Sequence, residues 1–168
     1  MVVLGIDPGL ANCGFGVVRR DRTRIVALDG GVIATAASNA PEQRLAELFA
    51  GIDALLVRYE PAAVALESLF FGQNASSAFA VGQARGIVLG AAGLRATPCH
   101  DYTPQQVKRA VCGSGRAPKE QVTRMVQALL ALPEPPSPDH AADALAVAIC
   151  HANHAPFGAA LLETVGSR

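Results

Sequence analysis

The sequence predicts an α/β fold, in which a mixed five-stranded sheet with three antiparallel first strands carries helices on both faces. Three β-branched apolar runs joined by short turns occupy residues 2–35, and two more apolar runs follow at 62–68 and 96–102. Segments of helical periodicity lie before, between and after those two runs. This order is typical of a mixed sheet, and 168 residues that are 51% hydrophobic can bury a core.

The first three strands predict an antiparallel meander, because the links between them are short. Pro8-Gly9 ends the first strand, residues 21–23 form a turn, and Gly30-Gly31 predicts a bend or bulge in the third strand. The strands are predicted at residues 2–7, 14–20 and 24–35.

The rest of the chain predicts helices around two buried strands. Leucines at three-to-four spacing and Pro41 in the first turn indicate the first helix. The second helix is rich in glycine, alanine and serine, so we expect something to pack closely against it. Helices are predicted at 41–59, 74–94, 103–111, 118–132 and 138–154, and strands at 62–68 and 96–102.

Composition excludes several classes of protein. Fourteen basic residues balance 14 acidic ones, so the chain as a whole has no net positive charge that would attract a polyanion. Four scattered cysteines form no C-x-x-C pair, no signal peptide opens the chain, and no apolar run is long enough to span a membrane. We therefore expect a cytoplasmic protein with one domain over residues 1–154 and a disordered tail over 155–168.

Acidic residues and one histidine stand at unusual places. Asp7 and Glu67 each end an apolar strand, and His140 and Asp143 share a face of the last helix. Asp7 could instead cap its turn, His140 could be an exposed first-turn residue, and Asp139 reads as a surface acid. Together, three carboxylates and an imidazole suit Mg²⁺ or Mn²⁺.

Positive charge is concentrated between residues 95 and 124, a segment that contains six basic residues and only two acidic ones. A solvated helical face is the alternative. Beside a carboxylate cluster, however, a basic region suits phosphodiester cleavage, because cations hold the backbone and carboxylates hold metal.

The chain resembles the RuvC-type Holliday junction resolvases, a branch of the ribonuclease-H-like nucleases. The opening GIDPG alone would be weak, since actin-like ATPases share it, but their two lobes need more than 168 residues. The resemblance covers nearly the whole chain. It rests on GIDPGLANCGFGVV (5–18), ALESLFFGQNASSAFAVGQARG (65–86), YTPQQVKRAVCGSGRAPKEQV (102–122) and DHAADALAVAICH (139–151).

The resemblance implies the roles of particular residues. The metal ligands would be Asp7, Glu67, His140 and Asp143, with Lys119 as a further catalytic residue. His140 departs from the all-carboxylate form of the family, which favours Mn²⁺ relative to that form. Of the two phenylalanines after Glu67, we expect one to stack on bases and the other to fill the core. The implied DNA-binding residues are Phe70, Phe71, Asn74, Arg85, Lys108, Arg109, Arg116 and Lys119.

The resemblance also implies an activity and partners. We expect two Mg²⁺ or Mn²⁺ ions per site and paired nicks in four-way junction DNA that leave 5′-phosphate and 3′-hydroxyl ends, in recombination, repair and the SOS response. A two-fold junction calls for a homodimer, for which the helix at 74–94 is the predicted interface. A branch-migration helicase complex is the further partner. The alternatives are a nuclease acting on RNA–DNA hybrids and an inactive DNA-binding module.

Overall fold

The computed structural model describes residues 1–68 and 75–154. The predicted DNA contacts Phe70, Phe71 and Asn74 and the predicted tail at 155–168 lie outside the described residues. The elements are β1 (Val2–Asp7), β2 (Asn12–Arg20), β3 (Ile25–Ala34), α1 (Pro41–Tyr59), β4 (Ala63–Glu67), α2 (Ala75–Leu94), β5 (Cys99–Tyr102), α3 (Pro104–Cys112), α4 (Lys119–Leu130) and α5 (Asp139–His154).

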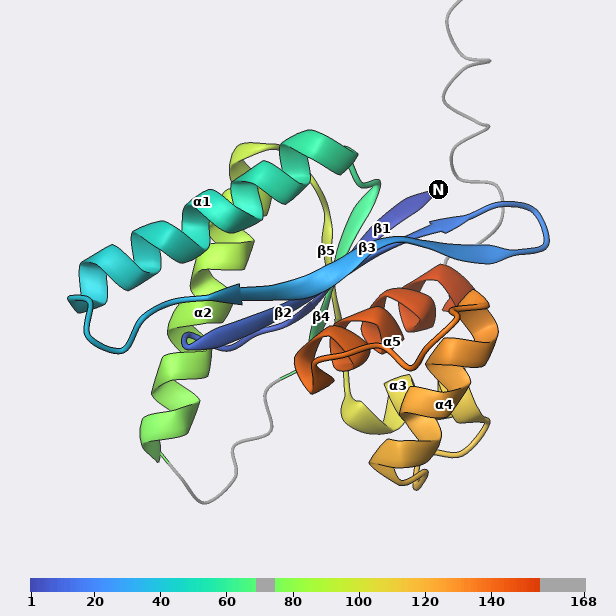
Figure 1. Cartoon of the computed structure of the whole chain (residues 1–168). Coiled ribbons are helices and arrows are strands. Elements are labelled where there is room, and N and C mark those ends of the chain that lie inside the picture. The colour runs from blue at the N-terminus through green and yellow to red at the C-terminus, as the bar shows by residue number, and fades with distance from the viewer. Residues whose placement is uncertain (69–74, 155–168) are drawn as a thin grey trace, which may run out of the picture.

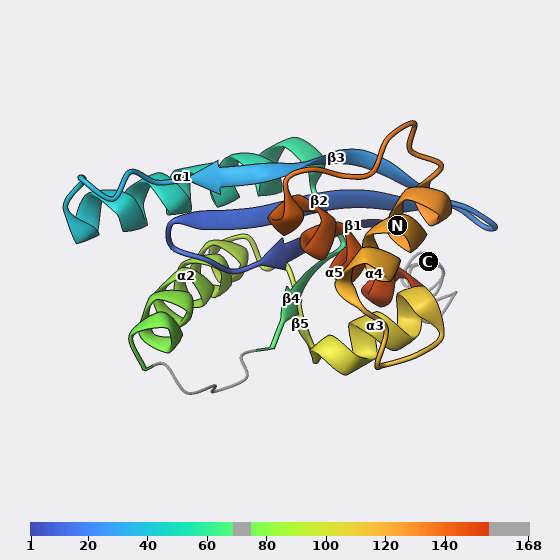
Figure 2. The ribbon, with the colours of Figure 1, turned by 60° about the horizontal axis from the view of Figure 1, so that its bottom comes forward.

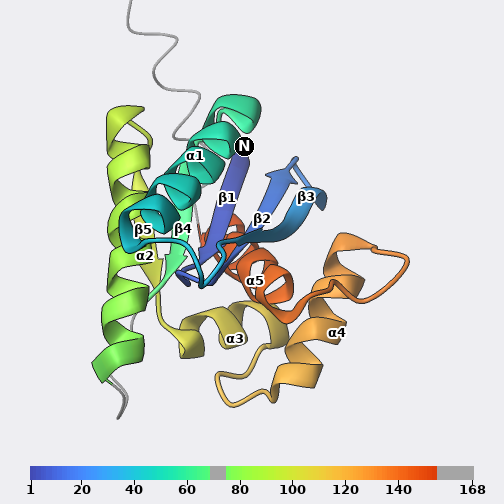
Figure 3. The ribbon, with the colours of Figure 1, turned by 60° about the vertical axis from the view of Figure 1, so that its left-hand side comes forward.

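The five strands form one sheet in the order β3-β2-β1-β4-β5. The pairs β1–β2 and β2–β3 are antiparallel, whereas β4 runs parallel to both β1 and β5. Helices α1 and α2 cover one face of this sheet, and α3, α4 and α5 cover the other (Figures 1 and 3). The predicted mixed sheet with helices on both faces is confirmed.

Two buried clusters hold the layers together because side chains alternate along each strand. Leu4 and Ile6 of β1 face α1 and α2, whereas Val3 faces the cluster built around α5. Helix α5 is buried almost along its whole length, from Ala141 to Ala152. No described helix is long and apolar enough to cross a membrane.

Besides shifts of one or two residues at the ends of several elements, two details of the strands differ from the prediction. The third strand is irregular at Leu28, since Val17 pairs with Asp29 and Val18 with Ala27, whereas Gly30 and Gly31 pair regularly. The last strand begins only at Cys99 rather than at residue 96, because Ala96 adopts a left-handed conformation with φ 52°.

Glycines let α5 lie unusually close to the sheet. A Cβ on Gly14 would overlap the backbone of His140, one on Gly5 would overlap the backbone at Ala144, and one on Gly16 would lie 2.7 Å from Leu145 N. Real Cβ atoms do not approach backbone this closely, so a larger residue would push the helix outward. The glycines of β1 and β2 therefore set the height of α5 above the strand that carries Asp7.

Candidate active site

Two acidic side chains leave the sheet at the same edge. Strands β1 and β4 are parallel neighbours in which Ile6 pairs with Leu66, so Asp7 and Glu67 follow at matching positions. A carboxylate at the end of a central strand is partly withdrawn from water. The side chain of Asp7 is only 18% exposed.

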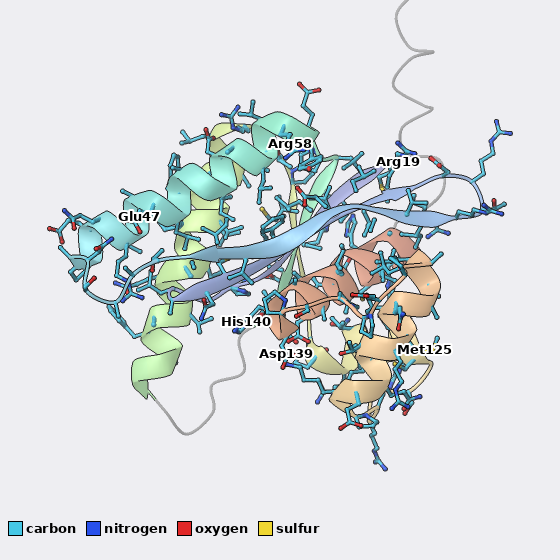
Figure 4. All side chains as sticks on the ribbon, in the orientation of Figure 1. Arg19, Glu47, Arg58, Met125, Asp139 and His140 are labelled. Atoms are coloured by element: carbon cyan, nitrogen blue, oxygen red, sulfur yellow. The ribbon has the colours of Figure 1, made fainter. Side chains whose placement is uncertain are left out.

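Helix α5 brings the next two residues over this edge. His140 Nδ1 lies 2.7 Å from Asp7 Oδ2, so a first-turn residue of α5 is hydrogen-bonded to the end of β1. Asp143 lies one turn further along, on the same face of the helix. Figure 4 shows His140 and Asp139 at the end of α5 that approaches the sheet.

Lys119 joins α4 to this end of α5. Its Nζ lies 3.1 Å from Oδ2 of Asp143 and 3.1 Å from Oδ2 of Asp139. Although partial burial lowers the pKa of Lys119, the hydrogen bonds to Asp139 and Asp143 outweigh it and raise the pKa. The ammonium group is therefore charged at neutral pH and held beside the carboxylates.

Electrostatics show that the three carboxylates act on one another. Burial, followed by the negative charges of Asp7 and Asp143, raises the pKa of Glu67 to about 7. Burial also raises the pKa of Asp143, an effect that Lys119 reduces and that Asp7 strengthens. Acids that disfavour each other's ionisation at one place are typical of a site that takes up positive charge.

A small cavity of about 160 Å³ lies beside the acids. Its polar lining comes from Glu67, Asp143, Lys108 and Lys119, with apolar walls that include Val107 of α3. The positive charge of Lys108 acts against the rise in the pKa of Glu67 and makes that rise smaller. The only two lysines of the sequence thus line a cavity together with two of the acids.

The four predicted ligands converge without forming a closed coordination sphere. Within residues 1–68 and 75–154, no three His, Cys, Asp or Glu side chains lie close enough together to hold one metal ion. The donor set still fits a hard divalent cation, because it combines mutually repelling, half-buried carboxylates with one imidazole.

The remaining predicted DNA contacts divide into two groups. Arg109 on α3 and Arg116 between α3 and α4 are exposed near the cavity's lysine-bearing helices. Arg85 on α2 instead binds Asp101 of β5, with Nη2 at 2.7 and 2.6 Å from its two carboxylate oxygens. Its Nη1 is buried and has no hydrogen-bond partner.

Sequence reasoning missed one structural contributor to the site. Asp139 is a surface acid as predicted, with its side chain 78% exposed, and it also binds Lys119 together with Asp143. The glycines at positions 5, 14 and 16 were read only as parts of strands. The two-residue spacing of Gly14 and Gly16, opposite an alanine-rich helix, is the signal that could have indicated close helix-on-sheet packing.

Comparison with known proteins then gives the family. The family model described as "Crossover junction endodeoxyribonuclease RuvC" matches residues 3–151. The chain belongs to the RuvC family. The RuvC of Moorella thermoacetica is 52% identical over 168 residues, which cover 99% of both chains. The RuvC of Rubrobacter xylanophilus is 50% identical over 151 residues, covering 90% of this chain and 84% of that protein.

Solved structures agree with the RuvC assignment. Thermus thermophilus RuvC in complex with a Holliday junction substrate superposes with a TM-score of 0.87 at 42% identity, covering 90% of this chain and 93% of that one. The yeast mitochondrial Holliday junction resolvase Ydc2 has a TM-score of 0.64 at 14% identity and covers 89% of this chain and 78% of that one, so it supports the fold alone. The predicted ribonuclease-H-like fold and the predicted family are confirmed.

Proposed function

We propose that this RuvC family member resolves four-way DNA junctions by metal-dependent hydrolysis of phosphodiester bonds at the cluster of Asp7, Glu67, His140 and Asp143. The observation that carries the proposal is the convergence of β1, β4 and α5 on one electrostatically coupled site. Family membership over the whole chain and the junction-bound relative favour a four-way junction over an RNA–DNA hybrid as the substrate.

We propose that the four residues hold Mg²⁺ or Mn²⁺, with two ions in each site. A bound divalent cation would stabilise charge on the phosphoryl oxygens and make water a better nucleophile. Asp7 links the other three ligands. Its carboxylate contacts His140, and its negative charge acts on both Glu67 and Asp143. The expected products are 5′-phosphate and 3′-hydroxyl ends.

The lysines supply fixed positive charge to the same reaction. Lys119, held 3.1 Å from Asp143, is positioned to stabilise the negative charge that develops on the phosphorus oxygens. Lys108 and the exposed Arg109 and Arg116 would hold the DNA backbone around the cavity. Arg85 already pairs with Asp101 and its Nη1 is buried, so its predicted DNA contact would require this ion pair to open.

The decisive experiment is cleavage of a synthetic four-way junction with Mg²⁺, with Mn²⁺ and with a chelator. Asp7→Asn is expected to lower the cutting rate by more than about 100-fold. Mutation of residues that only hydrogen-bond to metal ligands already lowers activity by about 10–100-fold, and Asp7 would itself be a ligand. Junction binding in an electrophoretic shift should persist. Asp21→Asn, the same change at an exposed carboxylate that pairs with Arg19, is the control and should cut normally.

Three outcomes would contradict the assignment. Wild-type cutting by Asp7→Asn would show that the site lies elsewhere. Cutting in the chelator lane would exclude metal dependence, and faster cutting of an RNA–DNA hybrid would favour the alternative substrate. His140→Asp is expected to shift the preferred ion from Mn²⁺ towards Mg²⁺, since a carboxylate replaces a softer imidazole.

We further propose that residues 1–154 act as one nuclease domain and that two copies associate through α2. Four glycines at spacings of four, four and three residues have nothing within 4 Å of a Cβ position, and Phe79 beside them is 69% exposed. Two active sites related by two-fold symmetry match the symmetry of the junction. The glycines are Gly82, Gly86, Gly90 and Gly93.

Sedimentation velocity tests the dimer. The wild type should sediment as a dimer at micromolar concentration, and Gly86→Glu, which adds a charge to the open face, as a folded monomer. A wild-type monomer would refute the interface. A branch-migration helicase complex remains the proposed further partner, and the cytoplasm remains the proposed location.

A further inference from the structure

A second basic region lies far from the carboxylate cluster, on the hairpin between β2 and β3. Residues 19–24 read RRDRTR, so four arginines accompany a single aspartate, and that aspartate is already 3.5 Å from Arg19. The antiparallel register pairs Val2 with Arg19 and Asp7 with Gly14. The hairpin therefore lies at the opposite end of β1 from Asp7, about 17 Å away at 3.3–3.4 Å per residue.

A groove of about 560 Å³ runs between this hairpin and the ends of α4 and α5. Figures 1 and 2 show the hairpin extending beyond the sheet on the side of these helices. Arg20 fixes one wall, because its guanidinium donates to the carbonyl of Ala152 and to Asn153 Oδ1 at the end of α5. The groove is therefore built between three elements rather than formed by one loose turn.

The lining combines cationic and apolar groups. Arg22 and Arg24 are exposed, and within the described part of the chain their side chains make no hydrogen bond or ion pair. Opposite them, Leu129 is 41% exposed although it is a large apolar residue, and the partly buried Ile25 continues the apolar surface. Unpaired guanidinium groups beside exposed apolar surface are typical of a binding surface.

We propose that this groove binds an acidic, leucine-containing peptide segment of a partner protein. Guanidinium groups bind carboxylates in a two-pronged geometry, which Arg22 and Arg24 are free to offer. Apolar side chains of the same peptide would cover Leu129 and Ile25. A DNA backbone would satisfy the arginines but leave this apolar surface without a partner, which favours a peptide over a second DNA contact. A partner held here leaves the carboxylate edge open to DNA.

Fluorescence anisotropy tests the proposal with the full chain and a short labelled peptide that alternates Asp with Leu. Two control peptides replace every Asp with Asn, or every Leu with Ser, and both should bind weakly. Arg22→Glu and Arg24→Glu should each weaken binding of the Asp–Leu peptide by about tenfold or more, the value of a charge-assisted hydrogen bond. Leu129→Asn should weaken it without changing the charge.

The matched control for charge is Arg58→Glu on α1, which changes the net charge equally and lies away from the hairpin (Figure 4). It should leave peptide binding almost unchanged, and circular dichroism should show all variants folded. Equal losses with Arg58→Glu, undiminished binding of the Leu129→Asn variant, or displacement of the peptide by duplex DNA would each overturn the proposal. In the last case the groove would be a DNA contact.

Discussion

Replacing Gly14 with alanine is expected to impair strand cutting although Gly14 carries no chemistry. The added Cβ would overlap the carbonyl oxygen of His140 and lie 2.6 Å from its carbonyl carbon, whereas ordinary contact begins at 3.4 Å, so α5 must move away by at least about 0.8 Å. That movement separates His140 from Asp7, which are now 2.7 Å apart. A misplacement of about 1 Å can cost about 100-fold in rate, and overpacking typically costs about 1–3 kcal/mol of stability.

Gly30→Ala is the matched control. Gly30 also lies on a strand beneath α5, but a Cβ there would meet nothing closer than Leu145 Cδ1 at 3.4 Å, an ordinary contact. Urea denaturation should show a loss of stability for Gly14→Ala and none for Gly30→Ala. Single-turnover junction cleavage should fall about 100-fold for Gly14→Ala only. Wild-type cutting by a folded Gly14→Ala protein would refute the idea that this glycine sets the position of His140.

Three further predictions follow from the described contacts. Lys119→Met should slow single-turnover junction cleavage by about 10²–10³-fold, and unchanged rates would deny the lysine a role in the reaction. Burial lowers the pKa of His151 to about 4, with smaller contributions from neighbouring histidines, so the fold favours the neutral ring. The neutral ring of His151 therefore makes its full contribution to the free energy of unfolding above about pH 6.5. As the pH falls towards 4, this contribution is lost, by at most about 3 kcal/mol. Urea titrations at several pH values should show that His151→Asn removes this part of the acid sensitivity. Asp101→Asn should lower the stability measured in urea by about 1 kcal/mol, because it removes the carboxylate that pairs with Arg85; an unchanged midpoint would contradict this.

Local signals in the sequence predict most of the fold. Pro41 and the leucine spacing of the first helix define a segment that the structure reproduces at 41–59. The bulge position was wrong because Gly30 and Gly31 serve packing instead: Gly30 faces Leu145, and a Cβ on Gly31 would lie 3.0 Å from the ring of Phe15. Such contacts join residues far apart in sequence, and no local pattern records them.

The same limit applies to the candidate site. Polar residues at the ends of apolar strands predict that Asp7 and Glu67 gather at one edge, since the topology of parallel strands requires it. That Lys119 contacts both Asp139 and Asp143 depends on how α4 docks against α5, which the sequence does not encode locally. Likewise, the Arg85–Asp101 pair becomes visible only once α2 and β5 are adjacent.

The close packing of α5 on the glycines of the sheet has a consequence for fragments of the chain. Asp7 and Glu67 belong to β1 and β4, whereas His140 and Asp143 lie much later in the sequence, on α5. A fragment that ends before residue 139 would lack half of the proposed ligand set. We therefore expect a truncated copy to cut no junction, because cleavage awaits the docking of α5.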